Sequence, residues 1–111
     1  MNTAVYFTPN FNKRYKKYQK KYQSIDTDLK LFIDNLDNAA PIDLGGNIYK
    51  YRLLVKAKNK GKSGGFRIIT FEVLVTENDK DVTLITIYDK SELTTISKSK
   101  INEILKQEGL L

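Results

Sequence analysis

The first quarter of the chain carries its apolar residues at helical spacing. In residues 10–24, Phe11, Tyr15, Tyr18 and Tyr22 follow one another at intervals of four, three and four. This spacing predicts a helix with the aromatic side chains on one face and lysines around the rest. Tyrosines interleaved with lysines could stack on nucleic-acid bases. An aromatic stripe at helical spacing more often packs in a core, however, and we favour that interpretation.

A second helix is predicted directly after the first. Ser24 or Asp26 can cap it, and its apolar residues recur at positions i, i+3, i+4 and i+7. These residues are Leu29, Phe32, Ile33 and Leu36. Pro41, Gly45 and Gly46 then predict a break in the chain before the strands begin.

The second half of the chain has the patterns of β-structure. Residues 48–57 alternate: Lys50, Arg52 and Lys56 point to one side, and the apolar residues at 49, 51, 53 and 55 point to the other. Residues 66–76 and 81–89 are rich in β-branched and aromatic residues. The polar link at residues 77–81 predicts that these last two strands form a hairpin.

The predicted elements form one α+β domain over residues 1–111. A short strand at residues 4–7 opens the chain, and residues 97–111 predict a C-terminal helix that stops at Gly109. The order is β-α-α-β-β-β-α, which gives a small antiparallel sheet of about four strands, two N-terminal helices and a C-terminal helix. A length of 111 residues suits one domain with a single core.

Composition excludes several classes of protein. The chain has no cysteine, which rules out disulfide and thiolate chemistry and permits a reducing compartment. No apolar run approaches membrane-spanning length, and residues 1–11 lack the features of a secretory signal. We therefore expect a cytoplasmic protein with no membrane partner. We also expect neither metal nor cofactor, because the acids of the second helix segment look like a solvated face and helix-start charges: Asp26, Asp28, Asp34 and Asp37.

The positive charge is concentrated in two segments. The chain has a formal net charge of +6, and residues 1–25 and 44–71 contain cations but no acid. Such blocks suit a polyanion, whose phosphates release counterions when Lys and Arg approach. A Lys-rich helix face is also commonly just solvated. For residues 1–25 both interpretations stay open.

The letters Gly61-Lys62-Ser63 match the end of a nucleotide-binding P-loop, but the context does not. The motif requires a glycine where Lys56 stands, and it requires a following helix to hold the phosphate. Residues 64–73 predict a strand instead, so we reject nucleotide binding. The glycines at 61, 64 and 65 predict a tight hairpin loop, whose bare backbone would let a phosphate come close.

This loop is flanked by cations on three predicted strands. If residues 48–57 and 66–76 pair, Arg67 comes to the region of Lys50 and Arg52, and the third strand ends at Tyr88 and Lys90. The five side chains could then share one surface of the sheet. Each also has a structural interpretation, since Arg67 could pair with an acid such as Glu72 or Asp89, and Tyr88 could cap the core.

Residues 49–73, YKYRLLVKAKNKGKSGGFRIITFEV, and residues 84–92, LITIYDKSE, resemble the RelE/HigB branch of the RelE/ParE toxin superfamily. The resemblance is strongest to the subgroup marked by a GKSGG-aromatic-Arg loop, and it covers about residues 4–108. It implies a RelE-like fold and a toxin of a type II toxin–antitoxin system, of which the best-studied members cut mRNA on the ribosome. It further implies a cognate antitoxin, expected to be of the helix-turn-helix type, that blocks the site.

The resemblance also implies which residues act. The catalytic positions fall on Lys50, Arg52, Arg67, Tyr88 and Lys90, and we expect further RNA contacts from Lys56, Lys58, Lys62 and Ser63. Some family members use a histidine or a further arginine near the C-terminus, but this chain has no His and no Arg after Arg67. The identity of the proton carriers therefore stays open. Two alternatives remain: a ParE-type inhibitor of DNA gyrase, and an RNA-binding module without catalytic activity.

RNA cleavage without a metal requires removal of the 2′-OH proton, stabilisation of the phosphorane and protonation of the 5′-oxygen. A lysine acts as the base only where neighbouring cations or desolvation lower its pKa. Lys50 has such neighbours in Arg52 and Lys56. The planar fork of Arg67 suits the transition-state charge, Lys90 could neutralise the leaving oxygen, and Tyr88 could stack on a base or donate a proton.

Overall fold

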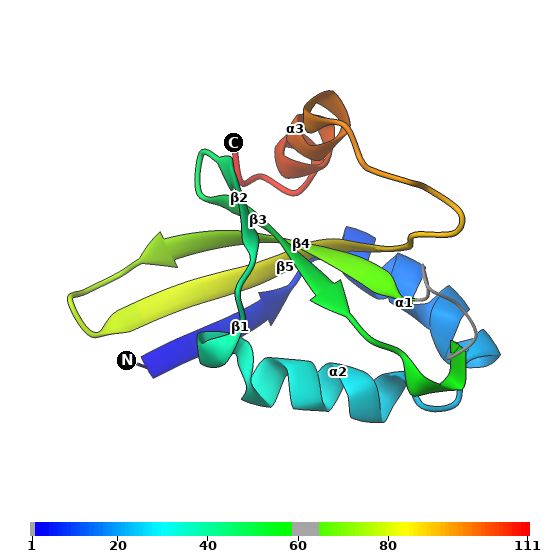
Figure 1. Cartoon of the computed structure of the whole chain (residues 1–111). Helices are drawn as coiled ribbons and strands as arrows, with labels where there is room; N and C mark the ends of the chain where they lie inside the picture. Colours follow the sequence, from blue (N-terminus) through cyan, green and yellow to red (C-terminus); the bar gives the residue numbers. More distant parts are fainter. Residues whose placement is uncertain (1, 59–64) are drawn as a thin grey trace.

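A five-stranded sheet separates two helices from a third (Figure 1). The structure is a computed structural model that describes residues 2–58, apart from the side chain of Lys58, and residues 65–111. The strands are β1 (Asn2–Phe7), β2 (Ile42–Gly45), β3 (Ile48–Leu53), β4 (Phe66–Leu74) and β5 (Asp79–Asp89). The helices are α1 (Pro9–Lys21), α2 (Ile25–Asp34) and α3 (Lys98–Gln107), with short 3-10 turns η1 (Leu36–Asn38) and η2 (Lys56–Lys58). The predicted α+β class is confirmed.

The sheet contains one strand more than predicted, and one of its pairings is parallel. The strand order is β1-β5-β4-β3-β2; β1 runs parallel to β5, and the other neighbours are antiparallel. The glycines expected only to break the chain form the turn of the β2–β3 hairpin, where Gly45, Gly46 and Asn47 have φ values of 87°, 60° and 67°. The prediction missed β2 because its four residues are too few to show a period.

Helix α1 begins at Pro9 because Thr8 holds its first turn. The Thr8 hydroxyl accepts a hydrogen bond from the Phe11 N–H at 3.0 Å and donates one to the Ile85 carbonyl oxygen at 2.7 Å, which ties the helix to β5. Phe11 and Tyr18 are buried in the core. Tyr15 and Tyr22 pack against that core, so the interpretation of the aromatic stripe as core is confirmed.

Helix α2 holds the segment that follows β3. Asp28 is only 5% exposed, and its carboxylate accepts hydrogen bonds from the Ser24 hydroxyl at 2.7 Å and from the Lys56 N–H at 3.1 Å. The Ser24 hydroxyl oxygen accepts the Ala57 N–H at 2.8 Å. Asp28 lies in the first turn of α2, as the prediction of helix-start charges requires, but it is buried and does not belong to a solvated face. Its side chain fixes η2 against the start of α2.

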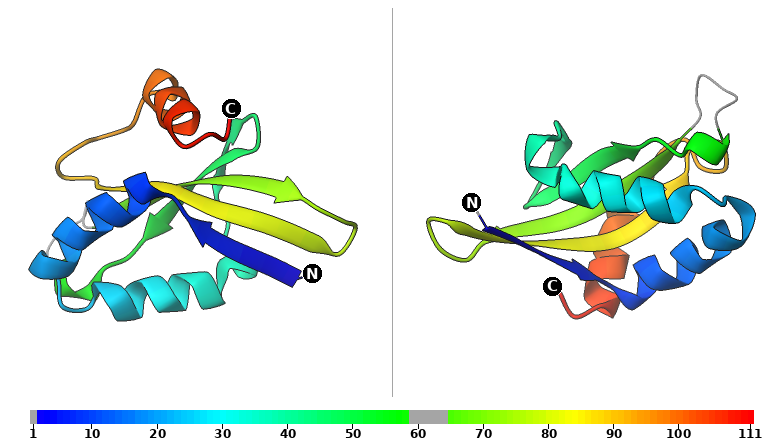
Figure 2. Two further views of the ribbon diagram at one scale, coloured as in Figure 1. Left: turned by 180° about the vertical axis from the view of Figure 1, so that it is seen from behind. Right: turned by 90° about the horizontal axis from the view of Figure 1, so that it is seen from below.

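The two faces of the sheet carry separate cores. Helices α1 and α2 cover one face, and α3 lies on the other (Figure 2). The core under α3 contains four sheet residues and three helix residues: Ile48, Ile69, Ile85, Tyr88, Ile101, Ile104 and Leu105. As predicted, α3 ends near Gly109, which has a φ of 73°. In the described part of the chain, the helices are too short or too polar to cross a membrane.

The position of Thr8 predicts a measurable contribution to stability. Thr8→Ala removes a helix cap and leaves the buried Ile85 carbonyl without its hydroxyl donor. We expect the free energy of unfolding to fall by about 1–2 kcal/mol, measured by urea denaturation. Thr27→Ala, at an exposed position on α2, serves as the control and should change it by less than about 0.5 kcal/mol. Equal changes in the free energy of unfolding for the two substitutions would show that the Thr8 cap contributes no more to stability than an exposed surface position does.

Candidate functional site

The strand register places cations from β3 and β4, and Tyr88 of β5, on one face of the sheet. Arg52 of β3 lies directly opposite Arg67 of β4, and Arg67 lies directly opposite Tyr88 of β5. Residues that face each other across a ladder point to the same side. Lys50 shares that side because it precedes Arg52 by two residues. The face is the one that carries α3.

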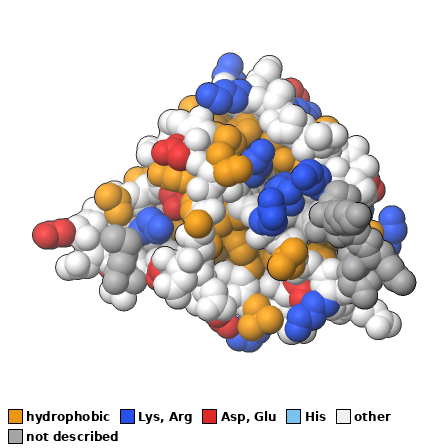
Figure 3. All heavy atoms as spheres, viewed as in Figure 1, with side chains coloured by type: hydrophobic (Ala, Val, Ile, Leu, Met, Phe, Trp, Pro, Cys, Tyr) orange, Lys and Arg blue, Asp and Glu red, His pale blue; other side chains and the backbone are white. Residues whose placement is uncertain are grey.

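Four of the predicted catalytic residues line a single open groove on this face. The groove has a volume of about 600 Å³ and contains Lys50, Arg52, Arg67 and Lys90. Its other lining residues are Ala40, Ile42, Tyr51 and Thr94. None of the described residues that line it is acidic. In the space-filling view, a cluster of Lys and Arg side chains stands out on this side of the molecule (Figure 3).

Among the described residues, none of the four groove cations has an acidic partner within ion-pairing distance. Glu72, considered from the sequence as a partner for Arg67, is buried on the opposite face of the sheet. It accepts hydrogen bonds from Tyr51, from Thr70 at 2.7 Å and from Lys80 at 3.3 Å. The groove therefore keeps its positive charge available for an anion.

Arg67 is half-buried in the groove. Burial and the positive charge of Arg52 lower the pKa of its guanidinium, while Tyr88 acts in the opposite direction. An arginine stays protonated in proteins in spite of such shifts. One arm of the guanidinium donates to the Phe66 carbonyl oxygen at 3.3 Å. The repulsion from Arg52 is the kind that a bound phosphate would relieve.

Gly65 sets the entry of the chain into β4. Its φ is 135°, and a Cβ atom there would lie 3.2 Å from the Leu53 carbonyl oxygen and 3.9 Å from Nη1 of Arg67. The Gly65 carbonyl oxygen accepts the Lys90 N–H at 3.2 Å. This bond places Lys90 beside the start of β4, close to Arg67. Glycine is needed here for its conformation and for the space next to the arginine.

Tyr88 is adjacent to the groove but does not line it. Its side chain is 1% exposed and packs with Ile101 and Ile104 of α3. Burial raises the pKa of Tyr88, while the Ile96 backbone, Arg67 and Thr95 act to lower it. Ile96 and Thr95 are near the hydroxyl, but no described group meets hydrogen-bond geometry with it. In this conformation Tyr88 caps the core and cannot stack on a base.

The sequence also predicted RNA contacts from Lys56, Lys58, Lys62 and Ser63. Lys56 is exposed in η2 and does not line the groove. Lys62, Ser63 and the side chain of Lys58 lie outside the described residues. The structure adds residues that the sequence prediction missed, notably Ile42, which is 58% exposed, and Thr94. A prediction that included strand β2 would have placed Ile42 at the groove, because Ile42 pairs with Lys50.

The first acid-free block lies on α1, away from the groove. Lys13, Lys16, Lys17, Lys20 and Lys21 are exposed. Arg14 is half-buried, and its Nε donates to the Ile87 carbonyl oxygen at 2.8 Å. These contacts fit a solvated helix face and a polyanion-binding face equally well, so both interpretations remain.

The geometry of the groove suits a phosphodiester. Arg67 stands on the central strand, with Arg52 and Lys50 on one neighbouring strand and Lys90 just beyond the end of the other. Because neighbouring strands are about 4.8 Å apart, the outer cations are separated by roughly 10 Å at the backbone. One phosphate above Arg67 would therefore have positive charge on both sides and a planar fork beneath it.

The pair of opposed arginines predicts an effect on stability. Arg52→Ala removes a like-charge contact across the strands, so we expect the free energy of unfolding to rise by about 0.5 kcal/mol in low salt. The gain should shrink in 1 M NaCl, because salt screens partly exposed charges. Urea denaturation measures the change in the free energy of unfolding at both salt concentrations, and urea is suitable because it is uncharged.

Lys56→Ala is the matched control, since it removes one exposed cation that lies outside the groove. It should change stability less than Arg52→Ala does. A loss of stability in the Arg52 variant at low salt would show that the two guanidinium groups do not repel each other in the folded protein.

Comparison with known proteins identifies a family for this chain. A family model for the RelE toxin of the RelE/RelB toxin–antitoxin system matches residues 10–109, which include every residue that lines the groove. A search of the curated proteins found no significant match. The match extends over most of the chain, from the start of α1 to the end of α3. The chain therefore belongs to the RelE toxin family, and this membership implies an antitoxin partner.

Proposed function

We propose that this toxin is a metal-independent endoribonuclease that cuts mRNA on the ribosome and so inhibits translation in the cytoplasm. One observation carries the proposal: Lys50, Arg52, Arg67 and Lys90 line one groove. A toxin that only blocks a protein target, such as a ParE-type gyrase inhibitor, does not require phosphate-binding residues gathered on its sheet. The sequence from Gly61 to Arg67 supports assignment to the RelE/HigB branch with a GKSGG loop.

The roles follow from the positions of the four cations. Arg67 holds the scissile phosphate through its planar fork and stabilises the charge of the phosphorane. Lys50, on one side, takes the proton of the 2′-OH as this oxygen attacks phosphorus, and it must do so as the neutral amine, because an ammonium group has no acceptor. Lys90, on the other side, gives a proton to the 5′-oxygen as its bond to phosphorus breaks. The products are a 2′,3′-cyclic phosphate and a 5′-hydroxyl, and Arg52 adds positive charge beside the phosphate.

The ribosome supplies what the groove lacks. The groove is open, Tyr88 is covered and Tyr51 is buried, so the described residues that line the groove offer no exposed aromatic ring to fix a base. In-line attack by a 2′-OH requires the reacting atoms to be oriented, and orientation contributes a large part of the rate of such reactions. An mRNA already held and bent in a ribosome would arrive oriented. The toxin then has to provide only charge and proton transfer.

The first test concerns Arg67. We expect Arg67→Ala to reduce mRNA cleavage at least about 100-fold, because it removes the central charge from the transition state. Arg67→Lys should recover only part of the activity, since an ammonium cannot bind phosphate through two arms. Primer extension on mRNA from expressing cells measures the cuts. Lys13→Ala, an exposed cation on α1, is the control. Wild-type cleavage by folded Arg67→Ala protein would remove the basis of the scheme.

The second test separates the alternative functions. Binding of single-stranded RNA should weaken with salt, and the slope of log K against log salt should fall by about 0.7 when Arg67 is replaced by alanine. RNA that is bound but never cut on ribosomes would indicate a non-catalytic module. Inhibition of DNA supercoiling without mRNA cleavage would indicate a gyrase inhibitor.

A further inference from the structure

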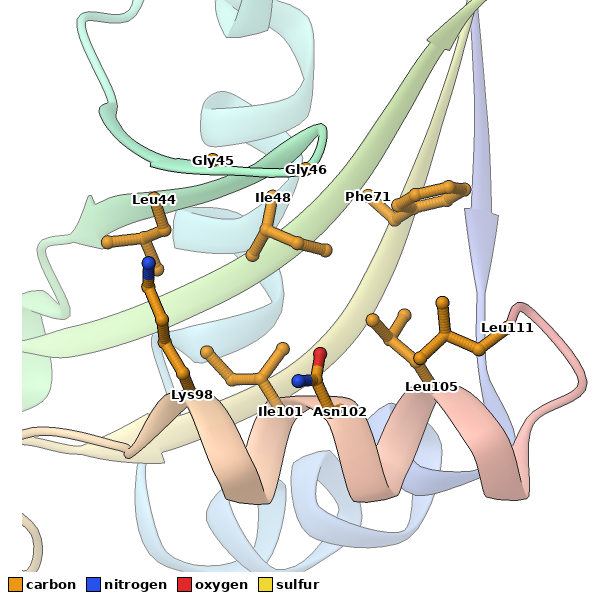
Figure 4. Close-up of a pocket in the computed structure, with 10 residues that line it drawn as sticks. All are labelled: Leu44, Gly45, Gly46, Ile48, Phe71, Lys98, Ile101, Asn102, Leu105 and Leu111. Atoms are coloured by element: carbon orange, nitrogen blue, oxygen red, sulfur yellow. The ribbon is translucent and has the colours of Figure 1, made fainter.

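The two sides of α3 border spaces of different chemistry. On one side, a mainly apolar groove lies between α3 and the β2–β3 hairpin (Figure 4). On the other side, a smaller cavity of about 140 Å³ lies between α3, β5 and the start of α1. None of the described residues that line this polar cavity also lines the groove that contains Arg67. Its polar lining residues are Asn10, Arg14, Thr86, Tyr88 and Lys100.

The polar cavity forms where β5 continues beyond the end of β1. The pairing of the two strands ends at Leu84, so the carbonyl groups further along this edge of β5 need other donors. Helix α1 and its cap supply them: the Thr8 hydroxyl donates to the first, and Nε of Arg14 donates to the Ile87 carbonyl oxygen at 2.8 Å. These bonds hold α1 in the position where Asn10 and Arg14 line the cavity.

Two buried polar atoms of the lining residues have no hydrogen-bond partner among the described residues. They are Oδ1 of Asn10 and the hydroxyl oxygen of Tyr88. Buried polar groups in folded proteins are nearly always paired, with protein groups or with a bound molecule, because an unpaired group loses its hydration without compensation. Two such atoms around one cavity indicate an occupant that can both donate and accept hydrogen bonds.

The Tyr88 hydroxyl needs an acceptor in particular. Burial raises the pKa of Tyr88, and the groups that act to lower it include the Ile96 backbone and Thr95. Groups that lower the pKa of a tyrosine in this way approach its oxygen as donors. The hydroxyl hydrogen is therefore the part of the group that lacks a partner, and an acceptor inside the cavity would supply one.

The polar cavity also favours negative charge. Arg14 is half-buried, and among the described residues no acid lies within ion-pairing distance of it. Lys100 pairs with Glu103 at 3.4 Å, but both side chains are 55% exposed, so this contact neutralises little of its charge. No described residue that lines the cavity is acidic. Two cations and a hydroxyl donor therefore face a space that an anion could occupy.

We propose that the polar cavity is a binding site for inorganic phosphate that still carries a proton. The phosphate oxygens accept a hydrogen bond from the Tyr88 hydroxyl and lie against the positive charge of Arg14 and Lys100. The P–OH group donates to Oδ1 of Asn10. A cavity of about 150 Å³ can hold benzene, so this one has room for a single oxyanion and not for a nucleotide. The site does not depend on the proposed nuclease activity.

The Asn10 side chain makes the site selective. At neutral pH inorganic phosphate keeps at least one proton, whereas sulfate keeps none. Sulfate would place an oxygen without a hydrogen against Oδ1 of Asn10 and leave this acceptor unpaired. Because an unpaired buried acceptor weakens binding by about tenfold or more, phosphate should bind at least about tenfold more tightly than sulfate.

The test is a titration of the ¹⁵N-labelled toxin with sodium phosphate and, separately, with sodium sulfate at constant ionic strength. Backbone amide signals in two-dimensional NMR spectra distinguish the two anion sites. Those of Leu93 and Ile96 report on the polar cavity, and those of Arg52 and Lys90 report on the groove. We expect the cavity signals to saturate at lower phosphate than sulfate, and the groove signals to respond alike to both anions.

Two substitutions separate the donor from the acceptor. Tyr88→Phe removes only the hydroxyl group, and we expect the phosphate affinity at the cavity to fall at least about tenfold. Asn10→Ala removes the unpaired acceptor, so the preference for phosphate over sulfate should disappear. Tyr6→Phe is the matched control, because Tyr6 is 51% exposed and lies outside the cavity. It should bind phosphate within about twofold of the wild type.

Urea denaturation checks that the variants are folded. Since the Tyr88 hydroxyl has no partner in the free protein, Tyr88→Phe should be at least as stable as the wild type without phosphate. Phosphate should then stabilise the wild type more than this variant, because a ligand that binds only the folded state raises its stability by mass action.

Three results would overturn the proposal: no saturable shift of the cavity signals at millimolar phosphate, equal affinities for phosphate and sulfate, or wild-type phosphate affinity in folded Tyr88→Phe protein. The first would mean that the cavity holds only water. Arg67→Ala keeps this test distinct from that of the nuclease. In this variant the groove signals should lose much of their response, while the cavity signals keep their preference for phosphate, because Arg67 does not line the cavity.

Discussion

The groove depends on two arginines that the sheet holds directly opposite each other. Arg52 and Arg67 would separate if the strands could slide, because like charges repel. They cannot slide, because the alternate residues Tyr51, Leu53 and Phe66 are buried on the other face. A shift by one residue would exchange the buried and exposed sets. Burial of one face therefore enforces the concentration of charge on the other.

The two faces of the sheet are covered unequally, and this difference creates the site. Helices α1 and α2 cover the first face, with Phe11, Tyr18 and Ile25 buried in its core. On the second face, α3 and the segment before it cover Tyr88 and leave Arg67 at the groove. The cations of that face have no acidic partner among the described residues. An open basic groove beside a covered tyrosine is the result.

Polar contacts outside the groove fix the segments that lead into it. Asp28 and Ser24 hold the backbone of η2 after β3, and the Gly65 carbonyl oxygen holds Lys90 beside β4. These bonds limit how far the strand ends can move.

The sequence alone determined the helices, the three long strands and the residues of the basic surface. It could do so because burial imposes periods of 3.6 and 2 that are visible in the order of residues, and because charge is visible directly. The tertiary structure decided the parallel pairing of β1 with β5, the strand β2 with Ile42, the burial of Asp28 and the covering of Tyr88. Each of these depends on partners far apart in the chain, such as Asn2 and Asp79 or Asp28 and Lys56. The spacing of apolar residues along a helix or strand does not predict such contacts. It indicates which face of the element is buried, but not which segment of the chain covers that face.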